Sequence, residues 1–151
     1  METDLIPLHV GARCLAAILA QNAANLLGKG PGVKRSPSYE KKKQAAGLQI
    51  DAEELYKFSR SQQAQTGLIS PATLGYLVTF CYGHLQLKAD LAQHLSGIAD
   101  ELLSKYPPTL GIPDPAITKA TTLRKIAEEI ATSREVLKNR TQILFKIIRA
   151  I

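Results

Sequence analysis

Tryptophan is absent from this sequence, and aromatic residues make up only 5% of it. The apolar residues are instead mostly Leu, Ile and Ala, a composition that favours helices over strands. Cysteine occurs only twice, at Cys14 and Cys81, each within an apolar run. Two such cysteines indicate buried thiols in a reducing compartment, since disulfide-stabilised domains are small and rich in cysteine.

Long apolar runs are also missing. The N-terminus has Glu2 and Asp4 where a secretory leader would carry basic residues, and the apolar run from Cys14 to Ala20 is too short to span a membrane. We therefore expect a soluble, cytoplasmic protein without a membrane partner. With 151 residues, of which 45% are hydrophobic, the chain can bury a core without metal or disulfide support.

Almost every segment has a helical pattern, so the fold class that we predict is all-α. Helices are expected at about residues 4–27, 51–64, 71–83, 87–105 and from Asp114 or Thr118 to the end, with a short helical turn at 39–46. Ser70 and Pro71 are typical of a helix N-cap and first helical residue. Asp51 with Glu54 resembles a capping box. The prediction is one bundle of about five helices over residues 1–151.

The expected last helix has a regular apolar seam. Its members lie seven residues apart, at Leu123, Ile130, Leu137, Leu144 and Ile151. Such spacing is typical of a helix face within a bundle. The chain also enters a helix soon after Met1 and stops on this seam, which fits a domain cut close to its ends or translated from an internal start.

No nucleotide-binding or catalytic motif stands out. The segment GKGPGVKRS, residues 28–36, contains glycines and lysines but lacks the P-loop spacing and has no preceding strand. The adjacent carboxylates Glu53/Glu54, Asp100/Glu101 and Glu128/Glu129 point to different faces of their helices, so the members of a pair cannot easily share a substrate. We therefore expect a protein that is not an enzyme.

The candidate metal ligands are few. Cys81 and His84 have a C-x-x-H spacing, and His94, Cys14 and His9 are the remaining candidates. A closed structural zinc site needs four ligands, usually from two paired motifs, and no second pair is present. We expect these residues to pack in the helical core and expect no metal or cofactor.

Basic residues give the strongest functional indication. The net charge is +6 and the pI is near 9.4, which favours a polyanionic partner such as nucleic acid. Residues 28–44 hold six Lys or Arg against Glu40 alone, so we expect a flexible basic loop there that contacts phosphates. The expected nucleic-acid-binding residues are Lys29, Lys34, Arg35, Lys41, Lys42, Lys43, Lys57, Arg60, Arg124, Lys138, Lys146 and Arg149.

Blander interpretations of the same charges are a solvated loop and ordinary charged helix faces. On the expected last helix, Arg124, Lys138, Lys146 and Arg149 would share one side, together with two acidic residues. Only Tyr39 and Tyr56 lie near the basic segments, so we expect contacts with the phosphate backbone and no base readout.

Residues 59–80, SRSQQAQTGLISPATLGYLVTF, combine a polar helix end, a short Gly-Leu turn and an apolar helix. Together with the small, basic, all-helical chain, this segment resembles the small subunit of CRISPR effector (Cascade-type) complexes. In one subtype that subunit is similar to the C-terminal helical domain of the large subunit and arises from an internal start.

The resemblance implies a non-catalytic subunit of an antiviral defence complex. Its partners would be guide RNA, target DNA or RNA, other subunits of the complex and neighbouring copies of itself. It would contact the guide–target duplex or the displaced strand through the phosphate backbone, while base pairing reads the sequence.

Two alternatives come from other functional classes. The first is a helical scaffold or oligomerisation module whose apolar seam docks on a partner protein. The second is a phage or plasmid DNA-packaging or nucleoid protein that binds duplex DNA as a dimer. Salt dependence separates the scaffold from the others, because phosphate binding weakens steeply as salt rises.

Overall fold

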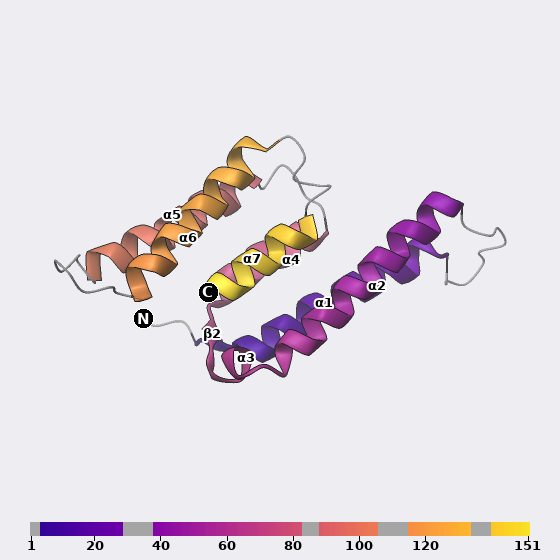
Figure 1. Ribbon diagram of the computed structural model, residues 1–151, viewed down its shortest axis with the longest axis horizontal. Helices are drawn as coiled ribbons and strands as arrows, with labels where there is room; N and C mark the ends of the chain where they lie inside the picture. The colour runs from indigo at the N-terminus through magenta and orange to yellow at the C-terminus, as the bar shows by residue number, and fades with distance from the viewer. Residues whose placement is uncertain (1–3, 29–37, 83–87, 106–114, 134–139) are drawn as a thin grey trace. The chain divides into compact units, whose positions relative to one another are not determined.

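The computed structural model describes residues 4–28, 38–82, 88–105, 115–133 and 140–151. Within these ranges the chain forms seven helices and one two-stranded sheet (Figure 1). The predicted all-α fold is confirmed. The number of described helices is seven, whereas we expected about five. Contacts divide the chain into two compact units, Met1–Tyr82 and Gly83–Ile151, where we had expected one bundle. No helix in these ranges is both long and apolar enough to cross a membrane.

The first unit begins with a short strand and not with a helix. β1 (Ile6–Pro7) pairs antiparallel with β2 (Leu68–Ile69), and α1 (Leu8–Leu26) follows directly. We had expected this helix to begin at Asp4. Pro7 explains the difference, because a proline disfavours the helical conformation in the residue before it.

The second helix begins twelve residues earlier than predicted. α2 (Tyr39–Ser59) has Ser38 as its N-cap, and the Ser38 hydroxyl accepts a hydrogen bond from the Lys41 N–H at 3.3 Å. Asp51, the expected start, lies in the middle of the helix. The expected flexible loop at 28–44 is therefore helical from Tyr39 onward, while residues 29–37 lie outside the described ranges.

The segment after α2 follows its local signals. α3 (Gln62–Thr66) is capped by Ser61, and α4 (Pro71–Cys81) is capped by Ser70, whose hydroxyl accepts from the Thr73 N–H at 3.1 Å. The predicted start of α4 at Ser70 and Pro71 is confirmed. The strand β2 lies between these helices and holds α3 against the start of α1 through its pairing with β1.

Small side chains pack α2 against α1. α2 buries a narrow stripe, and its members are Ala45, Ala52, Leu55 and Ser59. α1 contributes Ala12, Ala16 and Ala23 together with larger residues such as Leu15 and Leu19. The two helices lie side by side in Figure 1. Because the buried stripe of α2 is narrow, most of its remaining side chains face water.

The second unit contains three described helices, α5 (Lys88–Lys105), α6 (Pro115–Thr132) and α7 (Arg140–Ala150). α5 agrees with the predicted helix at 87–105. The single long last helix that we predicted is wrong, since α6 and α7 are separate and pack on each other. The seam residues Leu123, Ile130 and Leu144 are buried, whereas Leu137 lies outside the described ranges.

Of the two cysteines, Cys81 is buried as expected but Cys14 is exposed. Cys14 lies on the face of α1 opposite to the stripe that contains Leu15 and Leu19. The expectation for Cys14 was wrong because α1 is rich in Ala and Leu on all sides, so apolar neighbours in the sequence do not identify its buried face.

Gly67 has the closest neighbours among the glycines compared in the described chain. A Cβ atom there would lie 2.8 Å from the Gln63 carbonyl oxygen and 2.9 Å from Leu8 Cδ2. The Gly67 carbonyl, at the C-cap of α3, also accepts the Leu8 N–H at 2.8 Å, which joins the end of α3 to the start of α1. We predict that Gly67→Ala lowers the free energy of unfolding by about 1–3 kcal/mol, the range typical of overpacking.

Gly47 provides the matched control for that substitution. It lies in the middle of α2, and a Cβ atom there would meet nothing within 4 Å. Gly47→Ala should therefore stabilise the protein by up to about 1 kcal/mol through helix propensity. Urea unfolding of both variants measures the two effects, and a Gly67→Ala variant at least as stable as the parent would show that the close packing at Gly67 is not formed.

Candidate nucleic-acid interface

The twelve basic residues predicted to bind nucleic acid do not form one surface in the described parts of the chain. Four of them lie outside the described ranges: Lys29, Lys34, Arg35 and Lys138. Five belong to the first unit, on α2 or at its C-cap: Lys41, Lys42, Lys43, Lys57 and Arg60. Three belong to the second unit, Arg124 on α6 and Lys146 and Arg149 on α7.

The densest group is Lys41, Lys42 and Lys43, which we call the basic end of α2. All three side chains are exposed, and they occupy the first two turns of the helix. Successive residues of a helix diverge by about 100°. Lys43 therefore lies opposite the buried stripe of α2 and Lys42 lies at its flank, whereas Lys41 is in line with the stripe and is exposed because it lies near the end of the helix.

The electrostatic setting of the basic end is unfavourable for cations. A helix N-terminus carries a positive partial charge, so acidic residues stabilise it and lysines do not. Glu40 is the one acidic residue in the first turn of α2. No ion pair joins Lys41, Lys42 or Lys43 to a carboxylate in the described part of the chain. Their positive charges therefore add to the field of the helix end.

Lys57 and Arg60 lie at the other end of α2 and do not extend the basic end. Lys43 and Lys57 share a face, but the fourteen residues between them correspond to about 21 Å along the axis. Glu53 and Glu54 are exposed on the intervening turns, within four residues of Lys57. This local charge balance makes Lys57 a weaker candidate than the basic end.

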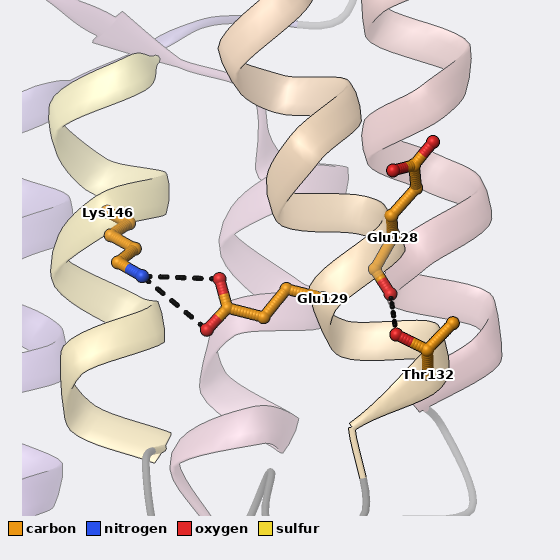
Figure 2. A network of polar contacts seen from close by, with 4 residues as sticks. All are labelled: Glu128, Glu129, Thr132 and Lys146. Carbon is orange, nitrogen blue, oxygen red and sulfur yellow. Dashed lines mark hydrogen bonds and ion pairs between the residues drawn. The ribbon is translucent and has the colours of Figure 1, made fainter.

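Two of the three predicted binding residues of the second unit form ion pairs within that unit. The Arg124 guanidinium pairs with the Asp100 carboxylate across α5 and α6. The Lys146 Nζ lies 3.2 Å from Glu129 Oε2 and 3.5 Å from Glu129 Oε1 (Figure 2). Neither pair was visible in the sequence, because the partners are on different helices and their spacing matches no helical period.

The Glu129–Lys146 pair also shows why the charged side predicted for one long helix does not exist. In a straight helix these residues would be about 25 Å apart, at 1.5 Å per residue. Figure 2 shows Lys146 reaching from α7 to Glu129 on α6, while the Glu128 side chain points away from this contact. Arg149 lies on the same face of α7 as Lys146, with its guanidinium carbon 5.3 Å from the centre of the Phe145 ring.

The candidate metal ligands and catalytic carboxylates do not assemble into a site in the described residues. No group of three or more His, Cys, Asp or Glu side chains there is placed to hold a metal ion. Glu101 forms an ion pair with Lys105 at 3.4 Å, and Asp100 and Glu129 form the pairs described above. His84 lies outside the described ranges.

His94 is a partly buried residue of α5 in the second unit. Burial lowers the pKa of His94 from its ordinary value of 6.5, because desolvation disfavours the charged imidazolium. The unfolded chain therefore binds a proton at His94 more readily than the folded chain does. The contribution of neutral His94 to the free energy of unfolding is fully present above pH 6.5. This contribution is lost as the pH falls through the pKa of His94 in the folded chain, which is lower than 6.5.

We predict that the thermal midpoint decreases between about pH 7 and about pH 5 and that His94→Gln makes this decrease smaller. Calorimetry or circular dichroism at a series of pH values measures the difference between the two profiles. Superimposable profiles for the parent and the variant would mean that His94 titrates alike in the folded and unfolded chains.

In comparisons with known proteins, no family model, no curated protein and no solved structure matches this chain. The resemblance of residues 59–80 to CRISPR small subunits therefore stays a hypothesis. The functional assignment depends on the charges and contacts of the described residues, among which the basic end of α2 is the most distinctive feature.

Proposed function

We propose that this protein is a non-catalytic nucleic-acid-binding protein and that the basic end of α2 contacts the phosphate backbone. The observation that carries the proposal is a run of three exposed lysines at a helix N-terminus, without a carboxylate partner in the described chain. Lysines and a helix N-terminus each attract phosphate, through charge and through backbone N–H groups respectively.

The unfavourable placement of these lysines supports the proposal. Acidic residues in the first turn of a helix typically contribute about 0.3–1 kcal/mol, and α2 forgoes most of this stabilisation. Positions at which a sequence breaks a local stability rule without a compensating contact are often functional. A bound phosphate would supply the missing negative charge.

A finer proposal concerns the biological setting. The resemblance of residues 59–80 to CRISPR small subunits supports a place in an RNA-guided effector complex in the cytoplasm, beside other subunits and further copies of this chain. Co-purification from the host with sequencing of the bound nucleic acid tests this setting. A guide RNA in the complex would support it, whereas duplex DNA alone would favour a DNA-packaging or nucleoid protein.

A helical scaffold is the second candidate, and exposed apolar residues favour it. Leu68 on β2 is 53% exposed and lies opposite Pro7 on β1, while Leu5 is 55% exposed and Val10 is 45% exposed. An apolar patch around this small sheet could receive a partner protein. The scaffold predicts association that is insensitive to salt, in contrast to phosphate binding.

Lys41→Glu tests the proposed phosphate contact. Lys41 is the third residue of α2 after the N-cap Ser38, so a glutamate there would complete a capping box and would interact favourably with the helix dipole. We predict that Lys41→Glu increases the free energy of unfolding by about 0.3–1 kcal/mol and so raises the thermal midpoint. The same variant should bind nucleic acid more weakly than the parent. Loss of one phosphate contact should reduce the slope of log affinity against log salt by about 1.

Lys125→Glu is the control, because it makes the same change of charge at an exposed position of α6 in the second unit. Fluorescence anisotropy with a labelled oligonucleotide at several salt concentrations compares the two variants. Binding by Lys41→Glu that equals the parent would contradict the proposal. An equal loss in both variants would show that total charge, and not the basic end of α2, determines binding.

A further inference from the structure

We propose that Tyr39 is a base-stacking residue and that the nucleic acid bound at α2 is single-stranded. This inference rests on the proposed function and adds the class of nucleic acid that the site recognises. It concerns residues of the described chain only: Tyr39 with Lys42 and Lys43.

The exposure of Tyr39 is the first observation. Its side chain is 76% exposed, the largest value among the large hydrophobic residues of the described chain. It is the first residue of α2, and the buried stripe of that helix does not include it. Tyr39 thus contributes little to the core, and its aromatic ring is open to a ligand.

The position of Tyr39 relative to the lysines is the second observation. Lys42 and Lys43 are three and four residues after Tyr39, the two spacings at which helix residues are surface neighbours, with Cβ atoms about 5–6 Å apart. Two lysines are therefore surface neighbours of Tyr39 on α2. An aromatic ring on which a base stacks, beside cations that follow the backbone, is the combination used for single-stranded nucleic acid.

The geometry disfavours a duplex as the partner of Tyr39. In a duplex each base stacks on its neighbours, so the ring would have to unstack a base pair, at a cost of a few kcal/mol. A single strand presents base faces without that cost. Stacking is also tolerant of sequence, so this contact agrees with the expectation that the bases are not read individually.

Tyr56 on the same helix shows that an exposed tyrosine alone is not sufficient. Tyr56 is 39% exposed, and the charged residues at its helical neighbour positions have opposite signs, Glu53 three residues before it and Arg60 four residues after it. The charge near Tyr56 is therefore balanced, whereas the two charged neighbours of Tyr39 at these spacings are both lysines. Tyr56 provides a matched comparison on the same α-helix.

Tyr39→Trp makes the contact directly observable. The protein contains no tryptophan, so this variant has a single indole at the proposed site. Addition of a single-stranded oligonucleotide should quench and shift its fluorescence, and a duplex of the same length should do so much less. A Tyr56→Trp variant should respond weakly to both. Equal responses to single strand and duplex at Tyr39→Trp would overturn the inference.

Affinity measurements with Tyr39→Leu and Tyr39→Phe complete the test. Tyr39→Leu should weaken single-strand binding about five-fold or more and leave duplex binding unchanged, because stacking contributes about 1–3 kcal/mol per base. Tyr39→Phe should retain the parent affinity, since the ring is kept. Circular dichroism verifies that α2 is intact in each variant.

The outcomes separate this inference from the proposed function. If Tyr39→Leu binds single strands as tightly as the parent while Lys41→Glu still weakens binding, Tyr39 is not a stacking residue but the phosphate contact stands. If the parent binds neither single strands nor duplex at low salt, both proposals fail. A stronger loss with Tyr56→Leu than with Tyr39→Leu would also contradict the assignment to Tyr39.

Discussion

The close packing of α2 on α1 through alanines determines which side chains of the first unit meet water. Ala45 and Ala52 of α2 and Ala12, Ala16 and Ala23 of α1 are buried, so the helices touch along a narrow strip. A helix attached by such a strip keeps most of its circumference exposed. Tyr39, Lys42 and Lys43 are outside the strip, and their availability to a ligand follows from the small size of the residues that hold the helix.

Charge is distributed evenly between the two units, but among the described residues ion pairs form in only one of them. Met1–Tyr82 contains nine Lys or Arg and six Asp or Glu, and Gly83–Ile151 contains ten and seven, so each unit has a formal net charge of +3. The described ion pairs all lie in the second unit, where they connect α5 with α6, α6 with α7, and successive turns of α5. These pairs are exposed and contribute little stability each. They nevertheless neutralise basic side chains that the sequence alone suggests are free to bind a ligand. The two units therefore differ in ion pairing although they have the same net charge.

Local signals in the sequence predicted local structure well and tertiary relations poorly. Ser70 followed by Pro71 identified the start of α4, because a cap and its first turn are adjacent in the chain. The start of α2 was misplaced, since Asp51 and Glu54 imitate a capping box while the true cap, Ser38, lies in a segment rich in lysine, glycine and proline. The heptad of apolar residues continues in the sequence from α6 into α7, so periodicity did not reveal that these are separate helices that pack on each other. Asp100 and Glu129, the partners of Arg124 and Lys146, lie on neighbouring helices and could be found only from the fold.

The same comparison explains why the candidate site is the basic end of α2, which is the described part of the basic segment 28–44 that the sequence had singled out as a flexible loop. Helicity fixes Lys42 and Lys43 beside Tyr39, a relation that a flexible loop would not impose. It also places the lysines at the positive end of a helix dipole, where they oppose the stability of α2. Exposed surface elsewhere on α2 offers positions at which the same lysines would be neutral or favourable, including its last turn. Their placement is therefore costly to the isolated fold, and a bound polyanion is the simplest physical compensation for it.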